Sequence, residues 1–215
     1  MPLPLVYRDV NVRAIASYDG TELATGKGIL NVYLATALSG ANVVLTESTF
    51  YGDPGYVEAF DTQTIDSDFD LEIANNFTID GTATINVPYM LRSVTANQNW
   101  VRGISLNIRK WDGTTETNLI SGSHLIKLFR GAGTDREFCY TQNVVVPKTF
   151  FSAGDTLRIT LGSTSAAGAG NEQRIYFGTN PKATSVKLVS DDADTFFDGA
   201  INSASVISLP VKIDI

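Results

Sequence analysis

The sequence predicts an all-β protein in which two antiparallel sheets pack face to face as a sandwich. The clearest sign is strict alternation of apolar and polar residues at positions 104–109 and 156–161. Such alternation is typical of a strand with one buried and one solvated face. No stretch carries the apolar spacing of an amphipathic helix over more than two turns. Many short strands separated by turn signals favour a sandwich or a barrel over a fold of alternating strands and helices.

The same reasoning places each element along the chain. The expected strands are residues 29–35, 42–46, 68–73, 83–89, 101–111, 117–120, 125–130, 136–146, 156–161, 174–177, 185–189 and 205–215. Asp80-Gly81 and Asp112-Gly113 are expected to form tight turns, because Asp-Gly is common hairpin chemistry. Pro147 is expected to end the strand before it, since proline cannot donate a hydrogen bond to a neighbouring strand.

The first 64 residues differ from the rest of the chain. They hold fewer clean alternations and an aromatic-rich stretch at residues 48–56. We interpret residues 1–64 as an N-terminal arm or small β-appendage, and residues 65–215 as the sandwich.

Composition argues against several classes of function. The chain of 215 residues has a net charge of −7, and its Lys and Arg residues are scattered. Binding to nucleic acid needs clustered basic residues, so we expect no direct nucleic-acid partner. No segment approaches the ~20 apolar residues of a membrane-spanning helix, and the N-terminus lacks the pattern of a secretory signal. We therefore expect no membrane association, and synthesis in a cytoplasm without export by the ordinary route.

The residues that carry most enzyme chemistry are scarce. The chain has one histidine, His124, and one cysteine, Cys139. A catalytic triad would have to use His124, and a zinc site would lack ligands. We interpret His124 as a turn residue at a strand start, and Cys139 as a small buried residue. The sequence thus predicts no catalytic residue, no metal and no cofactor, and we expect that the protein is not an enzyme.

Two alternatives to this interpretation stay open. Asp66, Asp68 and Asp70 alternate in a predicted strand, where they would form a solvated edge that deters pairing with other sheets. Calcium binding by these carboxylates, or by the cluster at 191–194, is the alternative, although neither stretch has the spacing of a calcium loop. A glycosidase would need two carboxylates across a cleft, and nothing singles out a pair.

Six segments, taken in their order along the chain, resemble jelly-roll virion proteins of tailed bacteriophages, the group that includes capsid decoration or cement proteins. These segments are residues 69–71, 81–88, 108–113, 146–151, 153–159 and 209–215. The resemblance covers about residues 65–215. It implies an antiparallel jelly-roll sandwich, a structural role on the capsid exterior and a homo-oligomer, with a trimer favoured. It supplies no catalytic residues.

The resemblance leads us to expect a capsid decoration protein that binds the major capsid protein of the same virion and stabilises the assembled shell. Contacts with the shell or between subunits are expected from apolar and aromatic residues of the first 64, a type enriched at interfaces. These residues are Leu3, Leu5, Tyr7, Phe50, Tyr51 and Tyr56. The alternative is a carbohydrate- or receptor-binding module of a phage fibre or tail tip, with Trp111 as a candidate loop contact. Sequence pattern does not separate a decorating sandwich from a shell-forming one.

Overall fold

The computed structural model describes residues 27–36, 43–49, 56–59, 65–93, 100–128, 136–165, 173–179, 181, 186–187, 200–201 and 204–212. These residues form thirteen strands. The strands are β1 (Lys27–Thr36), β2 (Val43–Thr46), β3 (Tyr56–Ala59), β4 (Ile65–Glu72), β5 (Phe77–Ser93), β6 (Trp100–Trp111), β7 (Glu116–Leu128), β8 (Arg136–Phe151), β9 (Thr156–Ser165), β10 (Gln173–Gly178), β11 (Val186–Lys187), β12 (Ala200–Ile201) and β13 (Val206–Lys212). The described part of the chain offers no helix that could cross a membrane.

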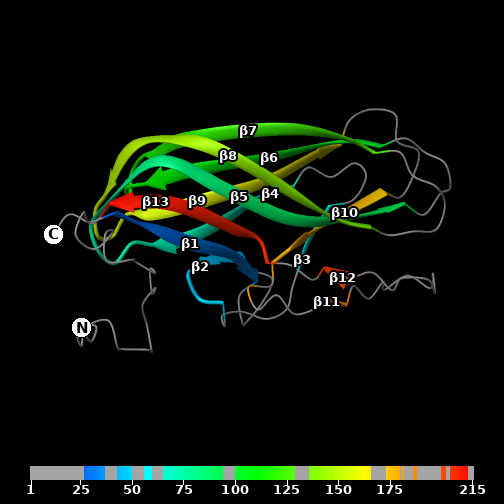
Figure 1. The fold of residues 1–215 in the computed structure, drawn as a ribbon, viewed down its shortest axis with the longest axis horizontal. Helices are drawn as coiled ribbons and strands as arrows, with labels where there is room; N and C mark the ends of the chain where they lie inside the picture. Colours follow the sequence, from blue (N-terminus) through cyan, green and yellow to red (C-terminus); the bar gives the residue numbers. More distant parts are fainter. Residues whose placement is uncertain are drawn as a thin grey trace.

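The strands form two main sheets, which are stacked face to face and overlap in the view of Figure 1. The larger sheet has the order β2-β1-β13-β5-β10-β3, and β8 pairs with β5. The smaller sheet has the order β4-β9-β6-β7. All of the pairings are antiparallel. The prediction of an all-β, antiparallel, jelly-roll-like sandwich is confirmed.

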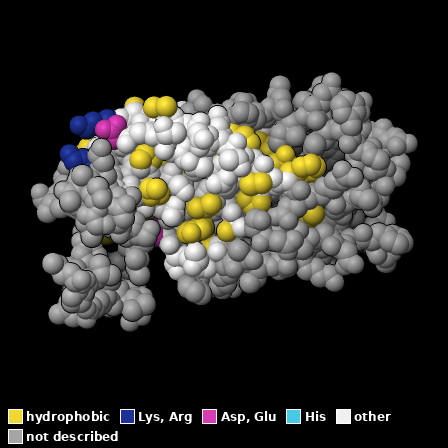
Figure 2. Space-filling view, viewed as in Figure 1, with side chains coloured by type: hydrophobic (Ala, Val, Ile, Leu, Met, Phe, Trp, Pro, Cys, Tyr) yellow, Lys and Arg dark blue, Asp and Glu magenta, His cyan; other side chains and the backbone are white. Residues whose placement is uncertain are grey.

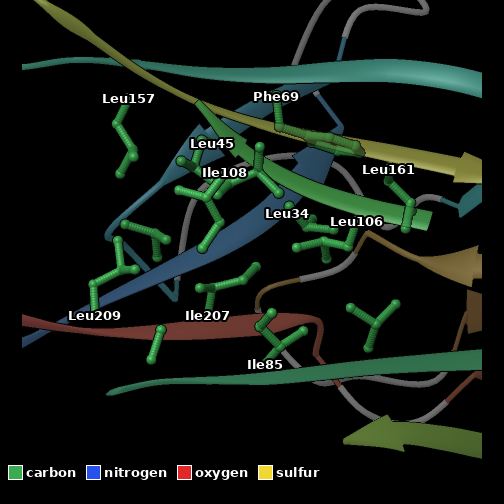
Figure 3. Packing of buried hydrophobic residues seen from close by; sticks show 14 of the residues in the cluster. Leu34, Leu45, Phe69, Ile85, Leu106, Ile108, Leu157, Leu161, Ile207 and Leu209 are labelled. Carbon is green, nitrogen blue, oxygen red and sulfur yellow. The ribbon is translucent and has the colours of Figure 1, made fainter. Parts of the chain in front are cut away.

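One hydrophobic core lies between the two sheets (Figure 3). The larger sheet contributes side chains such as Leu34, Ile85 and Ile207, and the smaller sheet contributes Phe69 and Ile108. Along β1, β5, β6, β9 and β13, alternate residues point into this core, because successive side chains of a strand alternate between its two faces. The alternation seen in the sequence therefore decides which residues are left on the two outer faces.

The long strand β5 organises the larger sheet. Strand β8 pairs along almost its whole length, from Phe77 opposite Phe151 to Leu91 opposite Arg136. Strand β13 pairs with the first half of β5, and β10 pairs with its end. The segment interpreted as an arm or appendage supplies β1, β2 and β3, which pair with β13, β1 and β10 respectively. Residues 1–26 of that segment lie outside the described residues.

Two Asp-Gly pairs that look alike in the sequence differ in the structure. Asp112-Gly113 forms the predicted turn between β6 and β7, where the Asp112 Oδ1 accepts hydrogen bonds from the backbone N–H groups at 114 and 115. The prediction of a turn at Asp80-Gly81 was wrong, because β5 continues through it. The pairing with β8 shifts there, from Ile79 opposite Thr149 to Gly81 opposite Val146, which marks a bulge.

The prediction that Pro147 ends its strand was also wrong, because β8 runs on to Phe151. Pro147 lies at the same bulge, and β8 pairs only with β5 among the described strands. An edge strand tolerates proline, since no further strand needs its missing N–H. The expected strands 117–120 and 125–130 are joined in β7 through Gly122, and the short strands β3 and β12 were not expected.

Candidate binding surface

The outer face of the larger sheet carries twelve neighbouring side chains without a single charge. They come from the four strands β1, β13, β5 and β8, and alternate with core residues along each strand. We call this surface the uncharged face; it comprises Ile29, Asn31, Tyr33, Thr82, Thr84, Asn86, Thr141, Asn143, Val145, Val206, Ser208 and Pro210.

Strand register arranges these side chains in rows across the sheet. In the middle row Asn31 lies opposite Ser208, Ser208 opposite Thr84, and Thr84 opposite Asn143. The Ser208 hydroxyl donates to Asn31 Oδ1 at 2.7 Å, and the Thr84 hydroxyl donates to Asn143 Oδ1 at 2.9 Å. These cross-strand hydrogen bonds hold the amide groups in place and leave a row of donors and acceptors at the surface.

The rows on either side are more apolar. On one side Tyr33 lies opposite Val206, and this row continues to Asn86 and Thr141, whose hydroxyl donates to Asn86 Oδ1 at 2.9 Å. On the other side Ile29 lies opposite Pro210, and Thr82 opposite Val145. The side chains of Ile29 and Val145 are 49% and 75% exposed. Both are large apolar groups that remain in contact with water.

Figure 2 shows hydrophobic side chains scattered over this broad side of the molecule, among white atoms that belong to the backbone or to uncharged polar side chains, with the visible charges gathered at one end. Strands lie ~4.8 Å apart and rows ~6.8 Å apart, so four strands and three rows cover about 400 Å². At the far end of β5 the next outward residues, Pro88 and Met90, are buried, and β12 contacts β5. The uncharged face is thus bounded by a charged end and a covered end.

The opposite side of the sandwich has the contrasting character. On the smaller sheet the Arg158 guanidinium of β9 donates to both carboxylate oxygens of Asp70 at 2.7 Å, and to Glu116 Oε1 at 2.8 Å. Asp68 lies 3.6 Å from the same guanidinium, and Arg109 donates to Glu116 Oε2 at 3.2 Å. The hydrogen bonds to Asp70 are the main reason that the pKa of Arg158 is raised above its ordinary value. This network spans all four strands of the smaller sheet.

A second charged contact fastens the connection between the sheets. The Lys110 Nζ of β6 lies 2.8 Å from Asp155 Oδ2 and donates to the Phe150 carbonyl at 2.8 Å. The Ser152 N–H also donates to Asp155 Oδ2, at 2.6 Å. Burial raises the pKa of Asp155, but the hydrogen bonds from Lys110 and Ser152 outweigh it, so that the pKa is lowered overall. This contact holds the turn by which the chain leaves the larger sheet after β8.

Most of the site residues predicted from the sequence lie outside the described residues, namely Leu3, Leu5, Tyr7, Phe50 and Tyr51. Tyr56 is the first residue of β3, opposite Gly178. Trp111 is the last residue of β6, half-buried beside the Asp112 turn. The uncharged face was not predicted. Its signal in the sequence is the lack of charge at alternate positions of 82–86, 141–145 and 206–210.

Three other residue predictions can be compared with the structure. Cys139 was expected to be buried but is exposed, because odd positions of β8 point to the outer face. His124 lies inside β7 opposite Ile104 rather than in a turn at a strand start. Asp68 and Asp70 are exposed, as expected for a solvated edge, and bind Arg158. Within the described residues, no group of three metal-binding side chains comes together.

Comparison with known proteins shows the fold but no family. No protein-family model matches the sequence, and no curated protein is similar to it. The chain is similar to a solved CocE/NonD family hydrolase from Staphylococcus aureus, at 10% identity and a TM-score of 0.53, over 87% of this chain and 37% of that one. It is also similar to an alpha-amino acid ester hydrolase, at 9% identity and a TM-score of 0.57, over 85% of this chain and 36% of that one.

The chain is less similar to a chain of the solved structure of infectious bursal disease virus, Gt strain, at 11% identity and a TM-score of 0.37, over 85% of this chain and 39% of that one. The chain spans little more than a third of the length of the two hydrolases that it resembles in structure. At 10% and 9% identity, the likeness to these hydrolases shows the shared sandwich fold alone.

The hydrolase structures overturn one prediction. We expected that the protein is not an enzyme, because the residues that carry most enzyme chemistry are scarce in the sequence. The solved structures with the higher TM-scores are hydrolases that contain such a sandwich. The expectation was therefore wrong: this architecture occurs in enzymes and gives no ground for excluding an activity.

Proposed function

We propose that this chain is a virion structural protein of a tailed bacteriophage, and that it decorates the capsid by laying its uncharged face on the outer shell. The observation that carries the proposal is the contrast between the two broad sides of the sandwich. One side bears an ion-pair network, and the other presents twelve uncharged side chains. The sequence resemblance to phage virion proteins supplies the class of partner.

The two broad sides of the sandwich differ in the free energy that the removal of water costs. The cores of protein interfaces are depleted of charged residues, because a charge that loses water without a partner is costly. Covering the uncharged face removes water from Ile29 and Val145 and from no ion. Covering the other side would bury Arg158, Asp70 and Glu116. The uncharged face is therefore the side better suited to a partner.

Decoration would stabilise the shell by mass action. A protein that binds only the assembled shell shifts the assembly equilibrium toward it, and no chemical step is required. The uncharged face, of about 400 Å², is half the ~800 Å² that each partner of a standard interface contributes. The remainder would come from other contacts, for which we propose the segment that holds Leu3, Leu5 and Tyr7. Deletion of residues 1–10 is then expected to weaken attachment while leaving the sandwich folded.

Co-sedimentation tests this proposal. Purified protein is mixed with empty shells of the virus that encodes it, and bound and free protein are measured after pelleting. We expect saturable binding by the wild type and at least tenfold weaker binding by Ile29→Lys, which places a charge on the uncharged face. The matched control is Asn107→Lys, which places the same charge on the smaller sheet. Wild-type protein that does not pellet with shells, or equal loss in both variants, would contradict the proposal.

The middle row of the uncharged face favours one alternative function. Amide and hydroxyl groups stand in a line along this row, which consists of Asn31, Ser208, Thr84 and Asn143. Groups of these two types can both donate hydrogen bonds to sugar hydroxyls and accept hydrogen bonds from them. The alternative is a carbohydrate- or receptor-binding module of a fibre or tail tip. Saturable binding of host-surface glycans by the free protein, lost in Asn31→Ala with no binding to shells, would favour it.

A further inference from the structure

The outermost strand of the larger sheet has an unusual edge. Strand β8 is sixteen residues long and pairs only with β5 among the described strands. Every second residue of such a strand directs its backbone N–H and C=O away from the neighbour that it already has. From Phe138 to Val146 this edge carries no charged residue, and Val145 is its most exposed apolar side chain.

Three other edge strands, β4, β2 and β3, are protected from pairing. Strand β4, at the edge of the smaller sheet, carries the exposed carboxylates of Asp68, Asp70 and Glu72. Strands β2 and β3, at the ends of the larger sheet, are four residues long. Charges and shortness are the usual devices that prevent sheets from joining edge to edge. The stretch 138–146 of β8 has neither of them.

The second long edge lies on the same side of the sandwich. Strand β7 pairs only with β6 in the described part of the chain, and it contacts β8 (Figure 1). Nine residues at ~3.4 Å each make a seam ~30 Å long, and sheets stacked ~10 Å apart make it roughly 20 Å deep with side chains. The seam thus offers on the order of 600 Å² per copy. Two copies would bury about 1,200 Å² in total, which exceeds the ~1,000 Å² total expected of a specific interface.

We propose that two copies of this chain pair antiparallel through their β8 edges, across a two-fold axis perpendicular to the larger sheet. An antiparallel edge is complementary to itself, so that one uncharged stretch provides both partners. Side chains that lie opposite each other in paired strands point to the same face of the sheet. The two-fold axis must therefore be perpendicular to the sheet, because only such an axis keeps the outer faces of both copies on one side.

The pairing has a consequence for the uncharged face. It places the two faces side by side on one continuous sheet, so that about 400 Å² becomes about 800 Å², the size of one partner's share of a standard interface. This consequence rests on the proposed function, whereas the pairing itself does not. The two are therefore tested separately.

The test is the mass of the free full-length protein by sedimentation velocity, over a range of concentrations. Thr141 is exposed and lies near the middle of the uncharged stretch. A two-fold axis that passes near this residue brings Thr141 of one copy close to Thr141 of the other. We expect a wild-type dimer, and dissociation constants raised on the order of 100-fold in Thr141→Lys and in Thr141→Glu, because each opposes like charges. An equimolar mixture of the two variants should restore dimers.

Two controls separate the interface from the fold. Thr141→Val removes the hydrogen bond to Asn86 without adding a charge, and we expect it to remain dimeric. Ile29→Lys adds a charge to the same face away from the edge; it should dimerise normally even where it fails to bind shells. A wild-type monomer, a trimer, or a dimer that persists in both charged variants would overturn the proposal. Failure of the mixture to form dimers would also overturn it.

Discussion

Replacement of Asp155 by asparagine tests the account of how the two sheets are joined. The carboxylate accepts charge-assisted hydrogen bonds from Lys110 and from the Ser152 N–H, and its side chain is 10% exposed. Asparagine can keep the bond from Ser152 but loses the charge that faces Lys110. Exposed ion pairs contribute about 0–1 kcal/mol, and breaking a buried pair costs about 3–5 kcal/mol. Since Lys110 is 20% exposed, we expect a loss of about 2 kcal/mol at pH 7, between these limits.

The effect should depend on pH in a defined direction. The pKa of Asp155 in the folded protein lies below its ordinary value of 3.8. The carboxylate therefore contributes its full stability above the pKa of the unfolded chain, and this contribution is lost as the pH falls through the folded pKa. The difference in unfolding free energy between wild type and Asp155→Asn should be constant from about pH 7 to pH 5 and shrink below about pH 4.

Urea unfolding followed by circular dichroism at several pH values provides the assay. The matched control is Asp80→Asn, which removes an exposed carboxylate elsewhere in the described chain and should change the unfolding free energy little. A variant at Asp155 as stable as the wild type at pH 7 would refute the reasoning. So would a difference that stays the same at pH 2.

Four further substitutions are expected to lower the unfolding free energy by different amounts. Phe69→Ala empties a fully buried position between the sheets and should cost about 3–5 kcal/mol. Gly81→Ala should cost more than Gly113→Ala in urea unfolding, because both have positive φ but only the first would place a Cβ 3.3 Å from Pro210. Arg158→Gln should cost about 1 kcal/mol in low salt and less in 1 M NaCl, since its ion pairs are partly exposed.

The sequence predicted the sandwich because the signals that define it are local. The alternation at 104–109 and at 156–161 lies within single strands, so the residues of each strand indicate which of its two faces is buried. The Asp112-Gly113 turn was also predictable, since β6 and β7 follow each other directly. At Asp80-Gly81 the same dipeptide became a bulge, because β8 pairs with the chain on both sides of it. That outcome depends on a partner strand more than sixty residues away.

The candidate binding surface could not be predicted for a related reason. The side chains of Asn31 and Ser208 form a hydrogen bond with each other, although 177 positions separate the two residues in the chain. The lack of charge at alternate positions of each strand was visible, but the order β1-β13-β5-β8 that joins these positions was not. Cys139 shows the same limit: alternation says that neighbours point to opposite faces, and only the assembled sheet says which face is covered.

Side-chain footprinting with hydroxyl radicals, on free and shell-bound protein, tests the central claim most directly, because it maps the buried surface without any substitution. We expect Ile29 and Tyr33 to become protected when the protein binds shells, and Trp111 at the end of β6 to be labelled equally in both states. Protection of Trp111 with unchanged labelling of Ile29 and Tyr33 would contradict the claim that the uncharged face is the binding surface.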